Sequence, residues 1–201
     1  AEACRQQGTA LVHFSTDYVY GGHANLPLKE EDPVNPSGVY AQSKLEGERR
    51  ALQINPLTTI IRTSWVYSGF GNNFVKTMLR LGKERGELKV VFDQIGTPTY
   101  AGDLASTVLT MIDAVENGRC SPELLNGIYH FSNEGVASWY DFAVAIFELA
   151  GLKIKVHPIE TKDFPTPAVR PAFSVLNKAK IKAAFGLEIA HWREALRQAN
   201  L

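Results

Sequence analysis

Two short motifs hold residue types that could carry out acid–base chemistry. The first is the run Ser15-Thr16-Asp17, and the second is Tyr40-Ala41-Gln42-Ser43-Lys44. On a helix, residues four positions apart lie on one face, so the Tyr40 phenol and the Lys44 ammonium would be neighbours. A free tyrosine titrates near pH ~10, and a fixed cation beside it favours the phenolate form. A tyrosine held in this way near Ser or Thr hydroxyls is a candidate proton donor to a carbonyl oxygen.

The Tyr-x-x-x-Lys spacing also arises by chance on an ordinary solvated helix face. The catalytic interpretation therefore depends on the hydroxyl-bearing segment that precedes it. Buried strands are predicted over residues 9–14, 58–62, 90–92 and 127–131, and helices over 40–51, 74–81 and 103–115, with a further helix opening at Ser138 in a capping-box pattern. Both Ser15-Thr16-Asp17 and Thr63-Ser64-Trp65 then fall at strand ends. In parallel α/β sheets, ligands bind beyond the carboxyl ends of the strands, which favours a catalytic site here.

Alternating strands and helices predict a doubly wound sheet. We therefore expect an α/β fold: the C-terminal part of a Rossmann-like parallel sheet plus a small α/β substrate-binding lobe. Residues 1–150 would form the remainder of the nucleotide-binding domain with interleaved segments of the lobe, and residues 151–201 mainly the lobe. The Pro-rich segment 153–173 is interpreted as loops of that lobe.

Composition excludes several classes of protein. The 201 residues include 21 basic and 21 acidic ones, with no basic run to suggest nucleic acid or an anionic membrane. No apolar run approaches the roughly 20 residues that span a bilayer. Cys4 and Cys120 fit no metal-ligand spacing and are interpreted as reduced thiols of a cytoplasmic protein, and no metal site is predicted.

A nicotinamide-binding fold of this kind needs a glycine-rich turn opening its first helix. The sequence contains no such turn, because Gly69-Phe70-Gly71 follows the wrong strand and lacks the third glycine. The chain also begins within a helical pattern and without Met. We therefore expect it to be the C-terminal portion of a longer polypeptide, whose remaining part would need roughly 90 residues.

Longer motifs resemble a known family. They are STDYVYGG, the acidic loop Glu30-Glu31-Asp32-Pro33, YAQSKLEGE, IIRTSWVY, NNFV and DQIGTPTYAGDLA, and, near the C-terminus, Arg170-Pro171 with Ser174 and the run 191–196. Together they resemble the extended short-chain dehydrogenase/reductases and, within them, the dTDP-4-dehydrorhamnose reductase branch. Tyr-x-x-x-Lys indicates only the superfamily, whereas RTSWVY with DQ-x-G-x-P-T is specific to the branch. The resemblance covers essentially the whole chain.

The resemblance implies roles for individual residues. Tyr40 would be the catalytic acid, Lys44 would lower its pKa and hold the nicotinamide ribose, and Thr16 would hydrogen-bond the substrate carbonyl. Ser15, Tyr40 and Lys44 would contact NADPH or NADH, and Thr16, Asp17, Trp65 and Arg170 the sugar nucleotide. The residues alone leave other interpretations open: Trp65 as a core aromatic, Asp17 as a loop cap and Arg170 as a surface cation.

The reaction implied is reduction of the C4 keto group of dTDP-4-dehydro-6-deoxy-L-mannose to dTDP-L-rhamnose, a precursor of cell-surface polysaccharides such as lipopolysaccharide. The resemblance also makes a homodimer and a Mg²⁺ ion in the intact protein possible. One alternative is a nucleotide-sugar epimerase or dehydratase, although a dehydratase also needs an adjacent acid/base carboxylate and Thr16-Asp17 has no neighbouring Glu. Another is a non-catalytic regulatory subunit of methionine adenosyltransferase.

Overall fold

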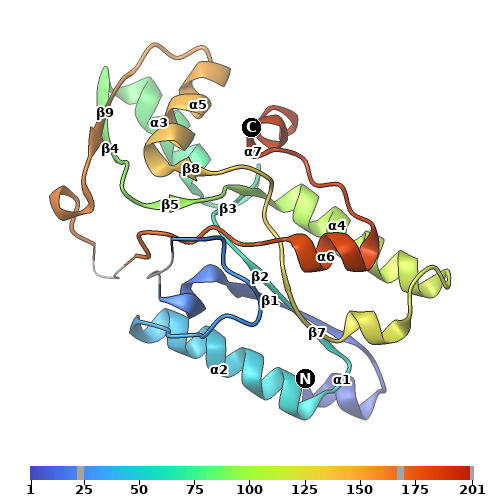
Figure 1. Ribbon diagram of the computed structural model, residues 1–201. Coiled ribbons are helices and arrows are strands. Elements are labelled where there is room, and N and C mark those ends of the chain that lie inside the picture. Colours follow the sequence, from blue (N-terminus) through green and yellow to red (C-terminus); the bar gives the residue numbers. More distant parts are fainter. Residues whose placement is uncertain (22–24, 167–169, 200–201) are drawn as a thin grey trace.

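A three-stranded parallel sheet forms the centre of the larger part of the molecule (Figure 1). The computed structural model describes residues 1–21, 25–166 and 170–199. The strands are β1 (Leu11–Thr16), β2 (Thr58–Thr63) and β7 (Gly127–His130), in the order β1-β2-β7. All six residues of β2 are buried, as expected for a β-branched strand covered on both faces. Because β1 and β2 are parallel, Thr16 lies opposite Thr63 at the same carboxyl edge.

Helices cover both faces of this sheet. Helix α2 (Gly38–Ile54) packs along β1 and β2 on one face. On the other face, α4 (Ala101–Glu116) and α6 (Ala179–Phe185) share an apolar core with the sheet, which includes Ile61, Leu104, Met111, Tyr129, Ile181 and Phe185. Figure 1 shows α2 below the strands and α4 with α6 above them. Short helices α1 (Glu2–Gln6) and η2 (Pro122–Leu125) precede β1 and β7.

A second lobe packs around its own core. It contains α3 (Phe74–Glu84), α5 (Trp139–Leu149), α7 (Trp192–Gln198) and a parallel pair of strands, β4 (Glu87–Val91) and β9 (Lys155–Ile159). Its buried residues include Tyr67, Val75, Met78, Phe142 and Trp192. The α/β fold with a separate lobe is therefore confirmed. We propose that the two domains interleave across residue 150. Helix α3 and strand β4, which precede that residue, belong to the lobe, whereas α6, which follows it, packs on the sheet.

Two predictions in this region need correction. The strand predicted at 90–92 is present with shifted bounds, Glu87–Val91, but it pairs with β9 and does not join the doubly wound sheet. Residues 155–159, predicted to be irregular, form that partner strand. Pro158 made a strand there improbable from the sequence, but proline is tolerated at the edge of a sheet, and a two-stranded pair has only edges. Residues 167–169 of the Pro-rich segment lie outside the described residues.

Short strand pairs connect the sheet to the lobe. Strand β3 (Val66–Tyr67) pairs in parallel with β6 (Thr99–Tyr100), and β5 (Ile95–Gly96) pairs antiparallel with β8 (Ala137–Ser138). Ser138 then starts α5 with the predicted capping box: Asp141 N donates to Ser138 Oγ over 3.0 Å, and Ser138 N donates to Asp141 Oδ2 over 2.9 Å. These links fix the lobe beside the carboxyl edge of the sheet.

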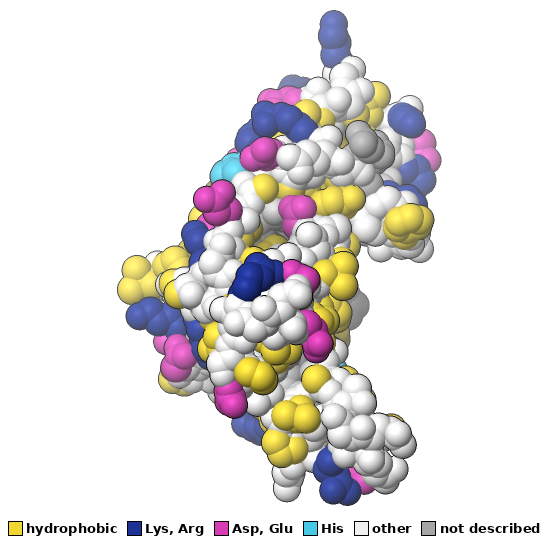
Figure 2. All heavy atoms as spheres, turned by 90° about the vertical axis from the view of Figure 1, so that its right-hand side faces the viewer, with side chains coloured by type: hydrophobic (Ala, Val, Ile, Leu, Met, Phe, Trp, Pro, Cys, Tyr) yellow, Lys and Arg dark blue, Asp and Glu magenta, His cyan; other side chains and the backbone are white. Residues whose placement is uncertain are grey.

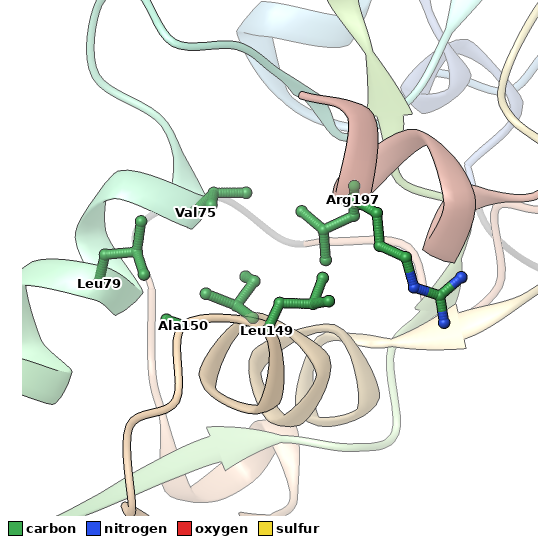
Figure 3. A pocket seen from close by; sticks show the side chains of 7 residues that line it. Val75, Leu79, Leu149, Ala150 and Arg197 are labelled. Carbon is green, nitrogen blue, oxygen red and sulfur yellow. The ribbon is translucent and has the colours of Figure 1, made fainter. Parts of the chain in front are cut away.

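The surface carries few concentrated features. On the face in Figure 2, basic and acidic side chains are interspersed, in keeping with the balanced charge. An apolar groove lies between α3, α5 and α7, lined by Val75, Leu79, Ile146, Leu149, Ala150, Leu196 and Arg197 (Figure 3), and it contains no candidate site residue. Among the described residues, no helix combines the length and apolar composition needed to cross a bilayer. Cys4 and Cys120 are free thiols.

Candidate active site

The end of β1 carries the predicted hydroxyl and acid cluster. Ser15, Thr16 and Asp17 are all buried, and Asp17 opens the short helix η1 (Asp17–Tyr20). Thr16 caps this helix, because its Oγ1 accepts a hydrogen bond from Tyr18 N over 3.3 Å. The same hydroxyl donates to Asp17 Oδ1 over 3.0 Å. The cluster therefore lies at a strand end, as predicted, and Thr16 links the strand to the carboxylate.

Asp17 is only 2% exposed, which changes its acid–base behaviour. Burial raises the pKa of its carboxyl to about 6, while hydrogen bonds from the Ser174 and Thr16 side chains and from nearby backbone N–H groups oppose the rise. A carboxyl that titrates close to neutral pH at a strand end is typical of a functional site. Asp17 is thus able to exchange a proton near neutral pH.

Helix α2 places Tyr40 and Lys44 beside this cluster. The Lys44 ammonium donates a hydrogen bond to the carbonyl oxygen of Phe14 in β1, with Nζ and O 2.6 Å apart. Tyr40 is 56% exposed, and its ring meets the Tyr18 ring edge-on with the centroids 5.8 Å apart. The predicted acid and its lysine are therefore gathered with Thr16 at one edge of the sheet, although Lys44 bonds to the strand and not to the phenol.

Two buried hydroxyls at this edge have no hydrogen-bond partner among the described residues. One is Ser15 Oγ, next to the carbonyl that Lys44 binds, and the other is Thr63 Oγ1, in the residue opposite Thr16. Buried polar groups are nearly always satisfied, by protein, water or ligand. Because alternate residues of a strand face opposite sides, Ser15 and Thr63 lie on opposite faces of the sheet. Ser15 lies on the face of α2 and Lys44, so of the two hydroxyls it is the one that fits the ribose or nicotinamide of the predicted cofactor.

Trp65 adopts a conformation that is rare for a bulky residue. Its φ is +49°, the only positive value found for a non-glycine residue in the described part of the chain. The indole stacks on Trp139 with the ring centroids 3.6 Å apart and the planes 9° from parallel. A Cβ at Gly96 would lie 2.7 Å from Trp65 Cε2 and 2.9 Å from Ser174 Oγ, so only glycine allows this close approach. Strained backbone of this kind clusters at functional sites.

A cleft next to the tryptophan pair could hold a flat, charged ligand. Its walls include Phe74, Met78, Lys89, Trp139, Phe164 and Arg170. The Arg170 guanidinium lies 6.0 Å from the centre of a Trp139 ring, and its charge opposes the burial-driven rise in the pKa of Tyr18. Arg170 is an exposed cation that lies next to Trp139 and near Tyr18. Aromatic faces with a planar cation suit a nucleotide base and phosphate.

Sequence reasoning missed part of this arrangement. Trp139 was predicted only as the first turn of a helix and Phe164 only as part of a loop, and Lys89 was assigned to no element. They line one cleft with Arg170 only because distant segments pack together. Across the described ranges, no three His, Cys, Asp or Glu side chains gather closely enough to hold a metal ion.

Comparisons with known proteins place the chain. Residues 1–200 match the family model described as the RmlD substrate binding domain. A protein of Aggregatibacter actinomycetemcomitans named dTDP-4-dehydrorhamnose reductase is 47% identical over 203 residues, covering 98% of this chain and 68% of the relative.

Two solved structures share the fold closely. A dTDP-4-dehydrorhamnose reductase from Clostridium acetobutylicum superposes with a TM-score of 0.91 at 46% identity. One from Bacillus anthracis, in complex with NADP, has a TM-score of 0.91 at 39% identity. Each comparison covers 98% of this chain and 67% of the solved chain. The chain thus spans about two thirds of the length of these relatives.

Proposed function

The chain belongs to the RmlD substrate binding domain family, and from this we propose that it supplies the proton donor and the sugar-nucleotide site of a dTDP-4-dehydrorhamnose reductase. The observation that carries the proposal is the meeting of Thr16, Tyr40 and Lys44 at one edge of the sheet, beside the strained Trp65. The relatives bearing this name support the same reaction.

In this proposal Tyr40 donates a proton to the O4 oxygen of dTDP-4-dehydro-6-deoxy-L-mannose as the C4 carbonyl is reduced, giving dTDP-L-rhamnose. A reduced nicotinamide, when bound, supplies the hydride to C4. The Tyr40 phenol is suited to proton transfer because it is exposed at the sheet edge. Lys44 fixes the helix turn next to it through Phe14 and would contact the cofactor ribose, with Ser15 as a further contact.

Thr16 is proposed to hydrogen-bond the same carbonyl oxygen. Its hydroxyl currently donates to Asp17 Oδ1, so donation to a substrate requires the hydroxyl to rotate away from the carboxylate. Protonation of Asp17 would weaken the competing bond, and the raised pKa of Asp17 brings that change close to neutral pH. Asp17 would therefore tune how readily Thr16 reaches the substrate, besides contacting the sugar.

The nucleotide part of the substrate is proposed to occupy the cleft next to the tryptophan pair. Trp65 would lie beside the sugar, and Trp139 and Phe164 would flank the base. Arg170, with Lys89 in the same wall, would neutralise the diphosphate, because a guanidinium can bind two phosphate oxygens at once. This assigns Arg170 to the diphosphate and Trp65 to the sugar.

The cofactor is proposed to be NADPH or NADH; the complex of the Bacillus anthracis relative with NADP supports a nicotinamide. We also propose that the 201 residues alone do not reduce the sugar, since they contain no glycine-rich turn to hold the pyrophosphate. The unpaired cysteines support a reducing compartment. A cytoplasmic location and a homodimer stay predictions.

The proposal is tested by product analysis with the full-length protein. It is incubated with dTDP-4-dehydro-6-deoxy-L-mannose and NADPH or NADH, and the products are identified by NMR. Formation of dTDP-L-rhamnose with one cofactor oxidised per sugar supports a reductase. An epimerised or dehydrated sugar without net cofactor oxidation would assign the protein to a related class. No turnover, together with co-purification of a methionine adenosyltransferase, would indicate a regulatory subunit.

A further inference from the structure

A buried ion pair joins helix α2 to the central strand β2. The Arg62 guanidinium binds the Glu48 carboxylate through three contacts: Nε to Oε1 at 3.0 Å, Nε to Oε2 at 3.2 Å and Nη2 to Oε2 at 2.7 Å. The two side chains are only 3% and 2% exposed. The Arg50–Glu46 pair within α2, by contrast, is exposed. Salt and solvent therefore screen the Arg62–Glu48 pair far less.

The ion pair is part of a larger polar network that extends from β2 to His130 on the neighbouring strand β7. Arg62 Nη1 donates to the Tyr20 hydroxyl over 2.5 Å, and that hydroxyl lies 2.7 Å from His130 Nε2. On its other side, His130 Nδ1 faces the carbonyl oxygens of Leu28 at 3.1 Å and Asn177 at 3.2 Å. Since carbonyls only accept, Nδ1 carries the proton and Nε2 accepts from Tyr20. Burial and the nearby Arg62 lower the pKa of His130 to about 3, so the ring is neutral.

The members of this network lie on the segments that carry the candidate site. Glu48 follows Lys44 by one turn on α2, and Tyr20 shares η1 with Asp17. Arg62 lies on β2, whose C-terminal end leads to Trp65. The carbonyl of Asn177 belongs to the segment that continues from Arg170 and Ser174. The network thus connects four parts of the site that are far apart in the sequence.

The catalytic end of α2 has few other constraints. Its N-cap residue, Ser37, makes no side-chain capping bond, and Val39 and Tyr40 are exposed. Ala41 and Leu45 are buried, and Lys44 bonds to Phe14. The Glu48 carboxylate is therefore the nearest fully buried polar anchor to the turn that holds Tyr40. Loss of this anchor would let that turn shift relative to β1.

We propose that Arg62 and Glu48 are positioning residues that set the location of Tyr40 and Lys44 relative to Thr16. The inference rests on the proposed function for its kinetic consequence, but its structural consequence is independent of it. Neither side chain contacts the proposed substrate. Their effect on turnover would come only through the placement of α2.

The test compares Glu48→Gln with Glu46→Gln in the full-length protein. Glu46 lies on the same helix in an exposed pair with Arg50, so it controls for loss of a carboxylate from α2. Each variant is studied well below its own Tm. For Glu48→Gln we expect kcat to fall at least about tenfold, since small misplacements of catalytic groups are costly, with the sugar-nucleotide KM within about twofold of wild type. Glu46→Gln should leave both parameters unchanged.

A second readout does not depend on activity. Hydrogen–deuterium exchange of residues 38–45 should accelerate in Glu48→Gln and not in Glu46→Gln. Unchanged kcat and unchanged exchange in a Glu48→Gln protein with a lowered Tm would overturn the inference, because the pair would then be purely structural. If wild type reduces no 4-keto sugar, the proposed function fails and the exchange result alone decides the positioning role.

Two further variants keep the test decisive if Glu48→Gln does not fold. Arg62→Lys retains the charge but loses the planar guanidinium that binds both carboxylate oxygens, so its kcat should be only a part of the wild-type value. Tyr20→Phe removes one hydroxyl of the network and keeps the ring, and it should lower kcat several-fold and speed exchange at residues 38–45. Wild-type turnover and exchange in both variants would contradict the proposal.

Discussion

The Lys44 ammonium hydrogen-bonds the backbone carbonyl of Phe14, 2.6 Å away, and so ties the helix that carries the candidate acid to the strand that carries Thr16. A side chain bonded to the strand in this way aligns two segments thirty residues apart. Its remaining protons can still reach a ligand, because an ammonium has three donors. Lys44 therefore links the two segments, and in the proposed function its remaining donors would contact the cofactor ribose.

Lys44→Met should lower kcat and raise the KM for the reduced cofactor. Both effects follow from losing the bond to Phe14 and the donor to the ribose, and we expect at least about a tenfold change in each. Steady-state kinetics with the cofactor varied at saturating sugar would measure this. Arg49→Met, on an exposed position of the same helix, is the control. A change confined to the sugar KM would point to a substrate role.

Tyr40→Phe should lower kcat by about 10²-fold or more, the usual contribution of a positioned acid. The ring and its contact with Tyr18 remain, so sugar-nucleotide binding should change little. Turnover and the Kd for dTDP-L-rhamnose are the measurements, with Gln42→Ala on the neighbouring exposed position as control. Near-normal turnover would remove Tyr40 from the role of acid.

Asp17→Asn should stabilise the fold at neutral pH while reducing activity. The pKa of Asp17 is raised from 3.8 to about 6, so the folded state holds this proton more tightly than the unfolded state does. The protonated carboxyl therefore favours folding below about pH 4, and this contribution is lost as the pH rises to about 6.

A rise of this size corresponds to about 2–3 kcal/mol, so the variant should gain up to that much at pH 7 and little at pH 4. Urea unfolding of wild type and Asp17→Asn at the two pH values would measure the difference. If the free energies of unfolding of wild type and variant differed by the same amount at both pH values, the pKa of the Asp17 carboxyl would not be raised by folding. Asn keeps the shape but cannot titrate, so the pH dependence isolates the proton.

Trp65→Gly should relieve backbone strain and weaken binding of the sugar nucleotide. Glycine adopts a φ of +49° at no steric cost, whereas the stack on Trp139 is lost. We expect the Kd for dTDP-L-rhamnose to rise about two- to tenfold, in line with the value of an aromatic stack. Isothermal titration of wild type, Trp65→Phe and Trp65→Gly should give that order of decreasing affinity. Equal affinities would leave Trp65 as a core residue only.

The isolated 201-residue chain should bind NADPH negligibly and should show no reduction of the 4-keto sugar. It has Tyr40, Lys44 and the lobe but no glycine-rich turn. It should keep weak affinity for dTDP-L-rhamnose, because the cleft with Trp139 and Arg170 lies within it. Titration with NADPH and then with dTDP-L-rhamnose tests both parts. Micromolar NADPH binding would show that another segment of this chain holds the pyrophosphate.

The sequence alone determined the local features of this protein. The i, i+4 spacing of Tyr40 and Lys44, the capping box at Ser138 and the hydroxyl-bearing ends of β1 and β2 all follow from periodicities within a single element. The family follows from motif order along the chain. Such signals can be read without knowledge of packing, because each depends on neighbours a few residues away.

Only the tertiary structure decided which distant residues meet. The pairing of β4 with β9, the Trp65–Trp139 stack, the burial of Asp17 and the Arg62–Glu48 pair all join segments separated by many residues. No periodicity encodes these contacts. They arise because distant segments bury apolar surface together, within the lobe for β4 and β9 and between α2 and the sheet for Arg62 and Glu48. Burial also raises the pKa of Asp17 and limits the screening of the ion pair.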